Sequence, residues 1–322
     1  MQRPRFLPDN MTLLLLTVVL IASFFPARDH VAAFFDQLSV WMIALLFFMH
    51  GAKLSREAVI SGLTHWRLHL LVLAITFAVF PVIGIVIKPA VLPLLTPDLY
   101  MGILFLCMLP STVQSSIAFT SVAKGNVSAA VCSASASNLF GIFLTPLLVS
   151  VLLKTTSGSG SSLDGMLKII VQLLLPFVAG QLLRPLLQAW ITKHAKVLKM
   201  VDQSSILLVV FVAFSEAVVQ GLWTQVPLVM LISILIISAT MLAIIMVMTT
   251  WASRRLGFNK EDEITIVFCG SKKSLASGVP MAKVLFSSGS VGLVLLPLML
   301  FHQLQLMVCA VLAQRYAKRE GA

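Results

Sequence analysis

The sequence predicts an all-α polytopic membrane protein with ten transmembrane helices. Of its 322 residues, 59% are hydrophobic and 11% are charged, whereas soluble domains carry about 25% charged residues. The mean hydropathy is +1.01. Ten apolar stretches approach the roughly 20 residues of helix that cross a hydrocarbon core about 30 Å thick. Helices are expected because backbone amides in a bilayer must be paired within the protein.

The ten stretches follow one another with mostly short connections. They are residues 11–27, 35–52, 68–88, 98–122, 127–153, 165–187, 201–222, 226–250, 261–286 and 290–314. A flexible linker, "TTSGSGSSLDG" at 155–165, lies midway and leaves five stretches on either side. The four cysteines lie in predicted spans without C-x-x-C spacing, so neither a disulfide framework nor a zinc site is indicated. These cysteines are Cys107, Cys132, Cys269 and Cys309.

The basic residues predict the orientation of the chain. The net charge of +11 does not indicate a nucleic-acid partner, because the basic residues concentrate in alternate connections. If the amino terminus is inside, the outer segments hold only Arg28, Lys88, Lys154 and Lys168. This distribution obeys the positive-inside rule. We therefore expect an integral protein of the plasma (inner) membrane with both termini in the cytoplasm and the lipid bilayer as its surroundings.

The two halves of the chain predict an inverted repeat. Five spans per half is an odd number, so the second half enters the membrane from the opposite side, as in many secondary transporters. The fourth span of each half is interrupted by polar residues, glycine and proline, in "MLPSTVQSSIAFTSVAKGN" (108–126) and "FCGSKKSLASGVPMAK" (268–283). Unwound backbone is tolerated at membrane depth where it lines a polar cavity or is buried in protein. The pair indicates a substrate and ion site, although Pro110 and Pro280 could each merely kink a helix.

Five stretches in this order carry a resemblance to a known family. They are "FFMHGAKLS" (47–55), "LPSTVQSSIAFTSVAKGN" (109–126), "FLTPLL" (143–148), "FCGSKKSLASGVPMAKVLF" (268–286) and "LPLMLFHQLQL" (296–306). The chain resembles the bile acid:sodium symporter family over nearly its full length. Within that family it is similar to the branch of sodium/bile acid cotransporter 7 and its bacterial homologues.

The resemblance implies two inverted five-helix repeats that build two domains. The panel domain would comprise residues 11–60 and 163–222, and the core domain residues 67–153 and 226–316. In the family, two broken helices cross in the core, two sodium ions sit beside the crossing in the sodium-coupled members, and the organic anion binds between core and panel. Transport would then follow alternating access.

The resemblance also implies candidate ion and substrate ligands. Sodium-coupled members carry an acid followed by Gly-Met-Gln-Asn on the second broken helix, where this chain has Cys269, Ser271, Lys272, Lys273 and Ser274. The first broken helix keeps small polar residues, and the span after it adds others: Thr112, Gln114, Ser115, Ser116, Ser133, Ser137 and Asn138. Sodium is the one cofactor suggested, with Ser115, Ser116, Ser133 and Ser137 as its candidate ligands. Because the acid is missing, no metal ligand is firmly assigned.

Two adjacent lysines in the second interruption need a compensating environment. Each lysine at the centre of a span costs roughly 2.5–3.5 kcal/mol on insertion scales. One ammonium could occupy the volume of a sodium ion, one could face an anionic substrate, or one could load and release a proton and couple transport to the proton gradient. Neighbours on a helix point about 100° apart, so the two differ in role. We assign Lys273 to the site, leave Lys272 open, and keep snorkelling to an interface as the structural alternative.

These features together predict a secondary active transporter of an organic anion or amphipathic solute. Glu216, an intramembrane carboxylate on the seventh span, is a further candidate that could line the cavity, pair with a lysine or sit near the outer surface. The alternative is an intramembrane enzyme or a regulatory membrane protein without transport, but the sequence has no H-E-x-x-H, G-x-S-x-G or Walker A pattern. The substrate, the coupling ion (sodium or proton) and the oligomeric state stay open.

Overall fold

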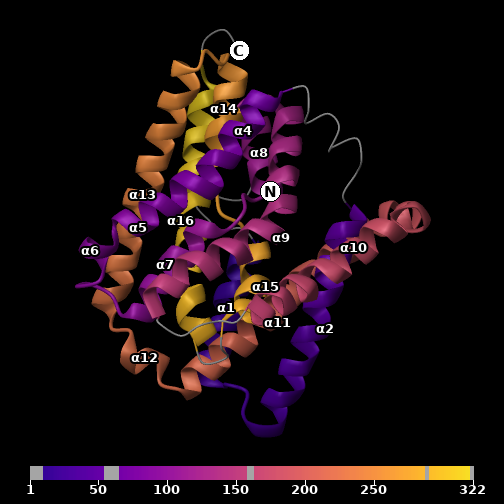
Figure 1. Ribbon diagram of the computed structural model, residues 1–322, viewed down its shortest axis with the longest axis vertical. Coiled ribbons are helices and arrows are strands. Elements are labelled where there is room, and N and C mark those ends of the chain that lie inside the picture. The colour runs from indigo at the N-terminus through magenta and orange to yellow at the C-terminus, as the bar shows by residue number, and fades with distance from the viewer. Residues whose placement is uncertain (1–9, 54–64, 158–162, 287–289, 320–322) are drawn as a thin grey trace, which may run out of the picture. The chain divides into compact units, whose positions relative to one another are not determined.

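The structure is a computed structural model that describes residues 10–53, 65–157, 163–286 and 290–319, and all regular secondary structure in these ranges is helical (Figure 1). Seven helical stretches within them are long and apolar enough to cross a membrane. These are Asp29–Lys53, Trp66–Val86, Val127–Leu153, Leu173–Lys193, Ala195–Val219, Leu228–Arg255 and Val291–Ala317. The predicted all-α membrane protein is confirmed. The count of ten spans and the inverted relationship of the halves stay predictions.

The chain divides into two compact units. Unit 1 contains residues 1–55, 146–227 and 279–295, and unit 2 contains residues 56–145, 228–278 and 296–322. Three helices supply residues to both units: α9 (Val127–Ser157), α15 (Leu275–Leu285) and α16 (Val291–Ala317). The division of the chain into panel and core domains stays a prediction.

Unit 1 is built around long apolar helices. Its own helices are α1 (Asn10–Phe24), α2 (Asp29–Lys53), α10 (Leu163–Lys193), α11 (Ala195–Val219) and the short α12 (Leu222–Gln225). The helix α2 packs along α10 and α11, and α1 packs on α11. Within unit 1, α2 therefore contacts two other long helices, and α11 contacts both α1 and α2.

Two glycines bring α2 and α10 into main-chain contact. A side chain at Gly51 would overlap the carbonyl of Phe177, and one at Gly180 would overlap the carbonyl of Phe48. Small residues at a helix–helix contact allow this close approach in membranes, where apolar burial between helices gives little driving force. The pairing of α2 with α10 therefore depends on both glycines.

Unit 2 contains shorter and interrupted helices. They are α4 (Trp66–Ala74), the single π-helical turn η1 (Ile75–Val79), α5 (Phe80–Val86), α6 (Lys88–Val91), α7 (Pro97–Met108), α8 (Gln114–Val122), α13 (Leu228–Arg255) and α14 (Lys260–Gly270). The segment from α4 to α5 is one span that carries a π turn, a feature frequent at functional sites.

Both interruptions that the sequence predicts are present. The first separates α7 from α8 at residues 109–113, and the second separates α14 from α15 at residues 271–274. Pro110 lies in the first break, but Pro280 lies inside α15 and does not form the second. The second break is therefore made by Ser271 to Ser274, which contain the two lysines.

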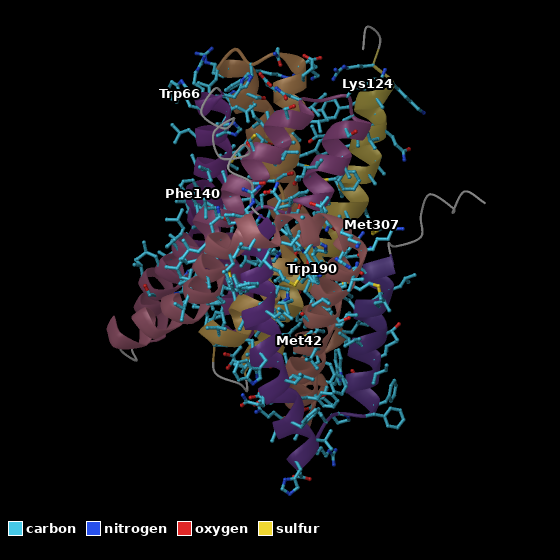
Figure 2. All side chains as sticks on the ribbon, turned by 90° about the vertical axis from the view of Figure 1, so that its right-hand side faces the viewer. Met42, Trp66, Lys124, Phe140, Trp190 and Met307 are labelled. Carbon is cyan, nitrogen blue, oxygen red and sulfur yellow. The ribbon has the colours of Figure 1, made fainter. Side chains whose placement is uncertain are left out.

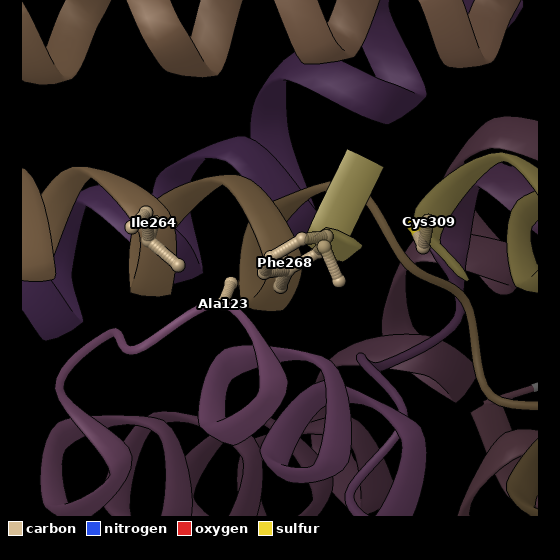
Figure 3. Packing of buried hydrophobic residues seen from close by; sticks show 5 residues of the cluster. Ala123, Ile264, Phe268 and Cys309 are labelled. Carbon is tan, nitrogen blue, oxygen red and sulfur yellow. The ribbon is translucent and has the colours of Figure 1, made fainter. Parts of the chain in front are cut away.

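The outer faces of the helices are apolar. Large hydrophobic side chains such as Trp66, Phe140, Trp190 and Met307 are exposed (Figure 2). An apolar exterior suits acyl chains, because the bilayer core offers no hydrogen-bonding partners. In unit 2, Ile264 and Phe268 lie one turn apart on α14 and pack with Ala123 and Cys309 (Figure 3). This cluster supports the helix that leads into the second break.

Candidate functional site

The two helix breaks of unit 2 lie against each other. The backbone N–H of Ser274 in the second break donates to the carbonyl of Pro110 in the first, at 2.9 Å. The hydroxyl of Ser111 donates to the carbonyl of Cys269 at 2.6 Å. Carbonyl groups near a helix break have no intrahelical partner. Here a donor from each interrupted helix binds such a carbonyl of the other.

The ammonium of Lys273 is surrounded by main-chain carbonyls. Its Nζ donates to the carbonyl oxygens of Thr76, Cys107 and Leu109, each at 2.8 Å. It also lies 4.1 Å from the centroid of the Phe80 ring, and the side chain is completely buried. A lysine ammonium has three donors and no acceptor, so these three carbonyls pair it completely.

The three carbonyls are available because of local helix irregularities. Thr76 lies in the π turn η1, whereas Cys107 and Leu109 lie where α7 ends and the chain becomes extended. A regular helix would have paired these carbonyls with amides further along the chain. The irregular backbone thus forms a cation-binding site, and Lys273 fills it from within the chain.

Gln305 on α16 holds the main chain of the second break. Its Oε1 accepts from the N–H of Lys273 at 2.8 Å, and its Nε2 donates to the carbonyl of Lys273 at 2.9 Å. His302, one turn earlier, lies with its Nδ1 2.9 Å from the same amide nitrogen. Gln305 is completely buried, so this two-point contact fixes the position from which the lysine side chain starts.

Lys272 points to different partners. Its Nζ donates to the carbonyl of Ser115 at 2.8 Å and lies 4.1 Å and 5.3 Å from the ring centroids of Phe119 and Phe268. Two aromatic faces and one carbonyl stabilise a cation less directionally than three carbonyls. The adjacent lysines therefore occupy separate environments on the two sides of the break.

Hydroxyl groups at the start of α8 form a short network. The Oγ1 of Thr112 lies 2.6 Å from the Oγ of Ser115 and 3.1 Å from that of Ser116. Ser116 donates to the carbonyl of Phe268 at 3.1 Å, which ties α8 to α14. Gln114 is exposed at the first residue of α8.

The helix α9 contributes a second set of contacts to the first break. The Oγ of Ser137 accepts from the N–H of Ser111 at 3.0 Å, and Asn138 donates to the carbonyl of Ser111 at 2.8 Å. Asn138 also accepts from Ser277 of α15 at 2.7 Å. Ser133 is placed elsewhere, because its Oγ lies 2.6 Å from Nδ1 of His69. Three of the four candidate sodium ligands thus lie at the breaks, whereas Ser133 pairs with α4.

The remaining candidates of the second break bond mainly within α14 and α15. Ser271 donates to the carbonyl of Val267 at 2.6 Å, and Ser274 donates to Ser277 at 3.1 Å. Cys269 is buried, with its Sγ 3.9 Å from the carbonyl of Ala130. A thiol at this position supplies no carboxylate oxygen for a cation.

The "AKGN" sequence positions α14. Asn126 donates through Nδ2 to Oδ1 of Asp262 at 2.9 Å, and its N–H donates to the carbonyl of Glu261 at 3.1 Å. Gly125 contacts Ile264 so closely that a side chain there would overlap it. The chain after α8 is thereby docked on the first turn of α14.

Glu216 belongs to unit 1. It lines a cavity of about 580 Å³ together with Arg28, Asp36 and Ser215. Asp36 forms an ion pair of 2.6 Å with Lys283 of α15. Glu216 thus lines a cavity of unit 1, and its role in transport stays a prediction.

Several groups of this site were not singled out from the sequence. The carbonyls of Thr76, Cys107 and Leu109 act through the main chain, so their side-chain types carry no signal. Phe80 and Phe119 are ordinary residues of an apolar span until a lysine lies over their rings. The sequence signal was the lysine inside a membrane span. Such a cation needs hydrogen-bond acceptors, but the sequence does not identify which groups they are.

The chain is similar to a family of transporters along nearly its whole length. The sequence profile of the SBF-like CPA transporter family matches residues 9–318. The uncharacterized protein PA2026 of Pseudomonas aeruginosa is 62% identical over 319 residues, which are 99% of this chain and 96% of the relative. The candidate symporter YfeH of Escherichia coli is 57% identical over 314 residues, 97% and 93% of the two chains. Sodium/bile acid cotransporter 7 of Rattus norvegicus is 26% identical over 276 residues, 84% and 80% of the two chains.

Proposed function

The chain belongs to the SBF-like CPA transporter family, and from this premise we propose that it is a secondary active transporter of an organic anion in which the ammonium of Lys273 takes the place of a coupling sodium ion. The family is one of transporters and symporters, not enzymes. The alternative of an intramembrane enzyme is therefore set aside.

The observation that carries the proposal is the set of three carbonyls around Nζ of Lys273, each at 2.8 Å. Backbone carbonyls on broken helices are the ligands that transporters of this kind offer to sodium. A sodium ion and the ammonium would compete for the same oxygens, and the ammonium is covalently attached. Transport would then proceed without sodium bound at these oxygens.

The ammonium form fits this environment better than the neutral amine. All three N–H donors have acceptors, and the Phe80 ring lies 4.1 Å below the charge. A neutral amine has two donors and would turn its lone pair towards one of the carbonyls. This favours a resident cation over a proton carrier at Lys273, and it leaves proton coupling to groups such as Glu216.

The proposed substrate class is taken from the name of one relative. One of them is named as a sodium/bile acid cotransporter, and we propose that this chain also carries an amphipathic organic anion. Alternating access between panel and core, an inner-membrane location and cytoplasmic termini are parts of the same proposal. The hydroxyls of Thr112, Ser115 and Ser116 and the amide of Asn138 are the polar groups we assign to the substrate and ion pathway beside the breaks.

The first test compares sodium with potassium at constant ionic strength. Thermal unfolding of the purified protein in detergent would be measured for the wild type and for Lys273→Gln, with Lys272→Gln as the matched control. A ligand that binds the folded state raises the unfolding temperature with the logarithm of its concentration. We expect no sodium-specific rise in the wild type or the control and a rise in Lys273→Gln.

A sodium-specific rise in the wild type would show that an ion site coexists with the lysine and would refute the replacement. Transport itself is tested by uptake of a radiolabelled bile acid into proteoliposomes. We expect saturable uptake that a sodium gradient does not change. Uptake that depends on inward sodium would contradict the proposed coupling while keeping the transporter assignment.

A further inference from the structure

A long groove runs along unit 2 between the C-terminal halves of α13 and α16. Its volume is about 1080 Å³. The lining positions begin at Ala243 on α13 and at Leu304 on α16 and recur on both helices at the spacing of a single helix face. The two stripes end at Arg255 and Tyr316, and the basic residues Arg254, Arg255 and Arg315 lie in the last turns of their helices. The groove is thus apolar along most of its length and basic at one end.

The floor of the groove is the apolar cluster that contains Ile264 and Phe268 of α14. Met246 from one wall and Leu312 and Tyr316 from the other pack against the cluster that contains Phe268. The Tyr316 and Phe268 rings lie 6.1 Å apart between centroids. The Phe268 ring is also in contact with the Lys272 ammonium. A single side chain, Phe268, therefore separates the floor of the groove from the second helix break.

The walls of the groove are exposed apolar side chains. Val247 on α13 is 68% exposed, and Met307 on α16 is 55% exposed and labelled in Figure 2. Any membrane protein shows such side chains to lipid, but here two parallel stripes enclose a recess. An acyl chain in this recess would contact protein on several sides rather than one, which is what distinguishes a bound lipid from a neighbouring one.

The basic end of the groove contains arginine side chains that form no ion pair within the described residues. The guanidinium of Arg254 is held by Glu263, with Nε 3.0 Å from Oε2. Arg255 and Arg315 also line the groove, and their side chains form no ion pair within the described part of the chain. Trp251 and Tyr316 lie near the same end, and these ring types concentrate at the membrane–water interface. The residue types at this end of the groove are therefore those found at the depth of the lipid headgroups.

We propose that this groove binds one anionic phospholipid, with its acyl chains along the apolar stripes of α13 and α16 and its phosphate between Arg255 and Arg315. Basic pockets between transmembrane helices are suited to anionic headgroups. A zwitterionic lipid carries the same phosphate but adds a quaternary ammonium near the arginines, so its net charge does not offset theirs. A second copy of the chain would have to bring two carboxylates to the same place. The site is separate from the helix breaks and does not depend on the proposed transport.

The test titrates the purified full-length protein in detergent with phosphatidylglycerol or with phosphatidylcholine of the same acyl chains. We expect phosphatidylglycerol to raise the unfolding temperature more than phosphatidylcholine does, since it binds the folded state. The double variant Arg255→Gln with Arg315→Gln should weaken its binding roughly 25-fold, which is about fivefold for each arginine. The variant Lys196→Gln with Lys199→Gln removes the same charge from exposed positions on α11 and should bind as the wild type does.

Two further variants separate the parts of the site. Val308→Trp fills the groove and keeps its charge, so it should weaken phosphatidylglycerol binding, whereas Arg255→Lys should retain most of it. Brominated phosphatidylglycerol should quench the fluorescence of Trp251, and this quenching should be lost in Trp251→Phe. Equal stabilisation by both lipids, or an equal loss in the α11 control, would overturn the proposal. So would native mass spectrometry showing a dimer that the groove variants abolish.

Discussion

The ammonium nitrogen of Lys273 lies 2.8 Å from the carbonyl oxygen of Leu109, the first residue after α7 ends. A side chain from one broken helix thus completes the hydrogen bonding of the other. Because the carbonyls of Thr76 and Cys107 bind the same nitrogen, η1, α7 and the second break are joined through one atom. The lysine is therefore part of the structural centre of unit 2 as well as of its candidate site.

Replacing this lysine should destabilise the protein strongly. In Lys273→Met the carbonyls of Thr76, Cys107 and Leu109 lose a charged donor inside a buried site. Hydrogen bonds to charged groups contribute about 1.5–3 kcal/mol each, so we expect a loss of at least about 3 kcal/mol. Lys272→Met removes one carbonyl contact and two ring contacts and should cost less. Denaturation in mixed micelles measures both, and equal losses would contradict the difference between the two lysines.

Gln305 should be needed for the geometry of the second break. Gln305→Leu leaves both the N–H and the carbonyl of Lys273 without their side-chain partner, which should cost about 2 kcal/mol or more. Gln303→Leu is the matched control on the same helix, because Oε1 of Gln303 is buried without a hydrogen-bond partner within the described residues. We expect this control to be neutral or slightly stabilising. A neutral Gln305→Leu in the same unfolding assay would show that the main chain of the break is held by other contacts.

The ion pair of Asp36 with Lys283 should contribute a modest coupling energy in unit 1. The Lys283 side chain is 7% exposed and that of Asp36 is 49% exposed, so solvent screens one partner only. A double-mutant cycle with Asp36→Asn and Lys283→Met should give about 1 kcal/mol of interaction. Additive effects of the two substitutions would show that the pair contributes nothing beyond its separate members. Glu216→Gln repeated in both backgrounds tests whether the third charge takes part.

The contact of α2 with α10 should not accept one extra methyl group. Gly180→Ala places a carbon atom on the carbonyl of Phe48, and the helices must separate to admit it. Overpacking of this kind costs about 1–3 kcal/mol. The comparison is Gly257→Ala, which meets open space and carries only the backbone strain of its φ of +75°, about 1 kcal/mol. An unfolding midpoint of Gly180→Ala at or above that of Gly257→Ala would be incompatible with main-chain contact.

Much of the helical organisation could be predicted from apolar length and polar interruption. The stretches 98–122 and 261–286 were expected to be interrupted, and each is divided in the structure. The position of the second break was harder to predict from the sequence, because Pro280 is the stronger helix breaker in that stretch. Proline is tolerated inside α15, whereas Lys272 and Lys273 leave the helix to reach acceptors on other segments.

The family was accessible from short motifs, and the match over residues 9–318 confirms it. The candidate ligands were harder to predict, because several hydroxyl residues follow one another on α9 and the sequence does not show which of them face the first break. Ser137 and Asn138 reach the first break, but Ser133 lies 2.6 Å from His69 instead. One helical turn separates these two outcomes, and periodicity alone does not decide between them.

The sequence by itself determined that this chain lies in a membrane, that two of its spans are interrupted, and that a pair of lysines must find compensation there. These properties follow from the free energy of transferring apolar and charged side chains, which depends on residue type. Only the tertiary structure decided which groups compensate the lysines. The carbonyls of Thr76, Cys107 and Leu109 come from segments more than 160 residues away from Lys273. Backbone oxygens are the same in every residue, so their role depends on where the chain brings them together.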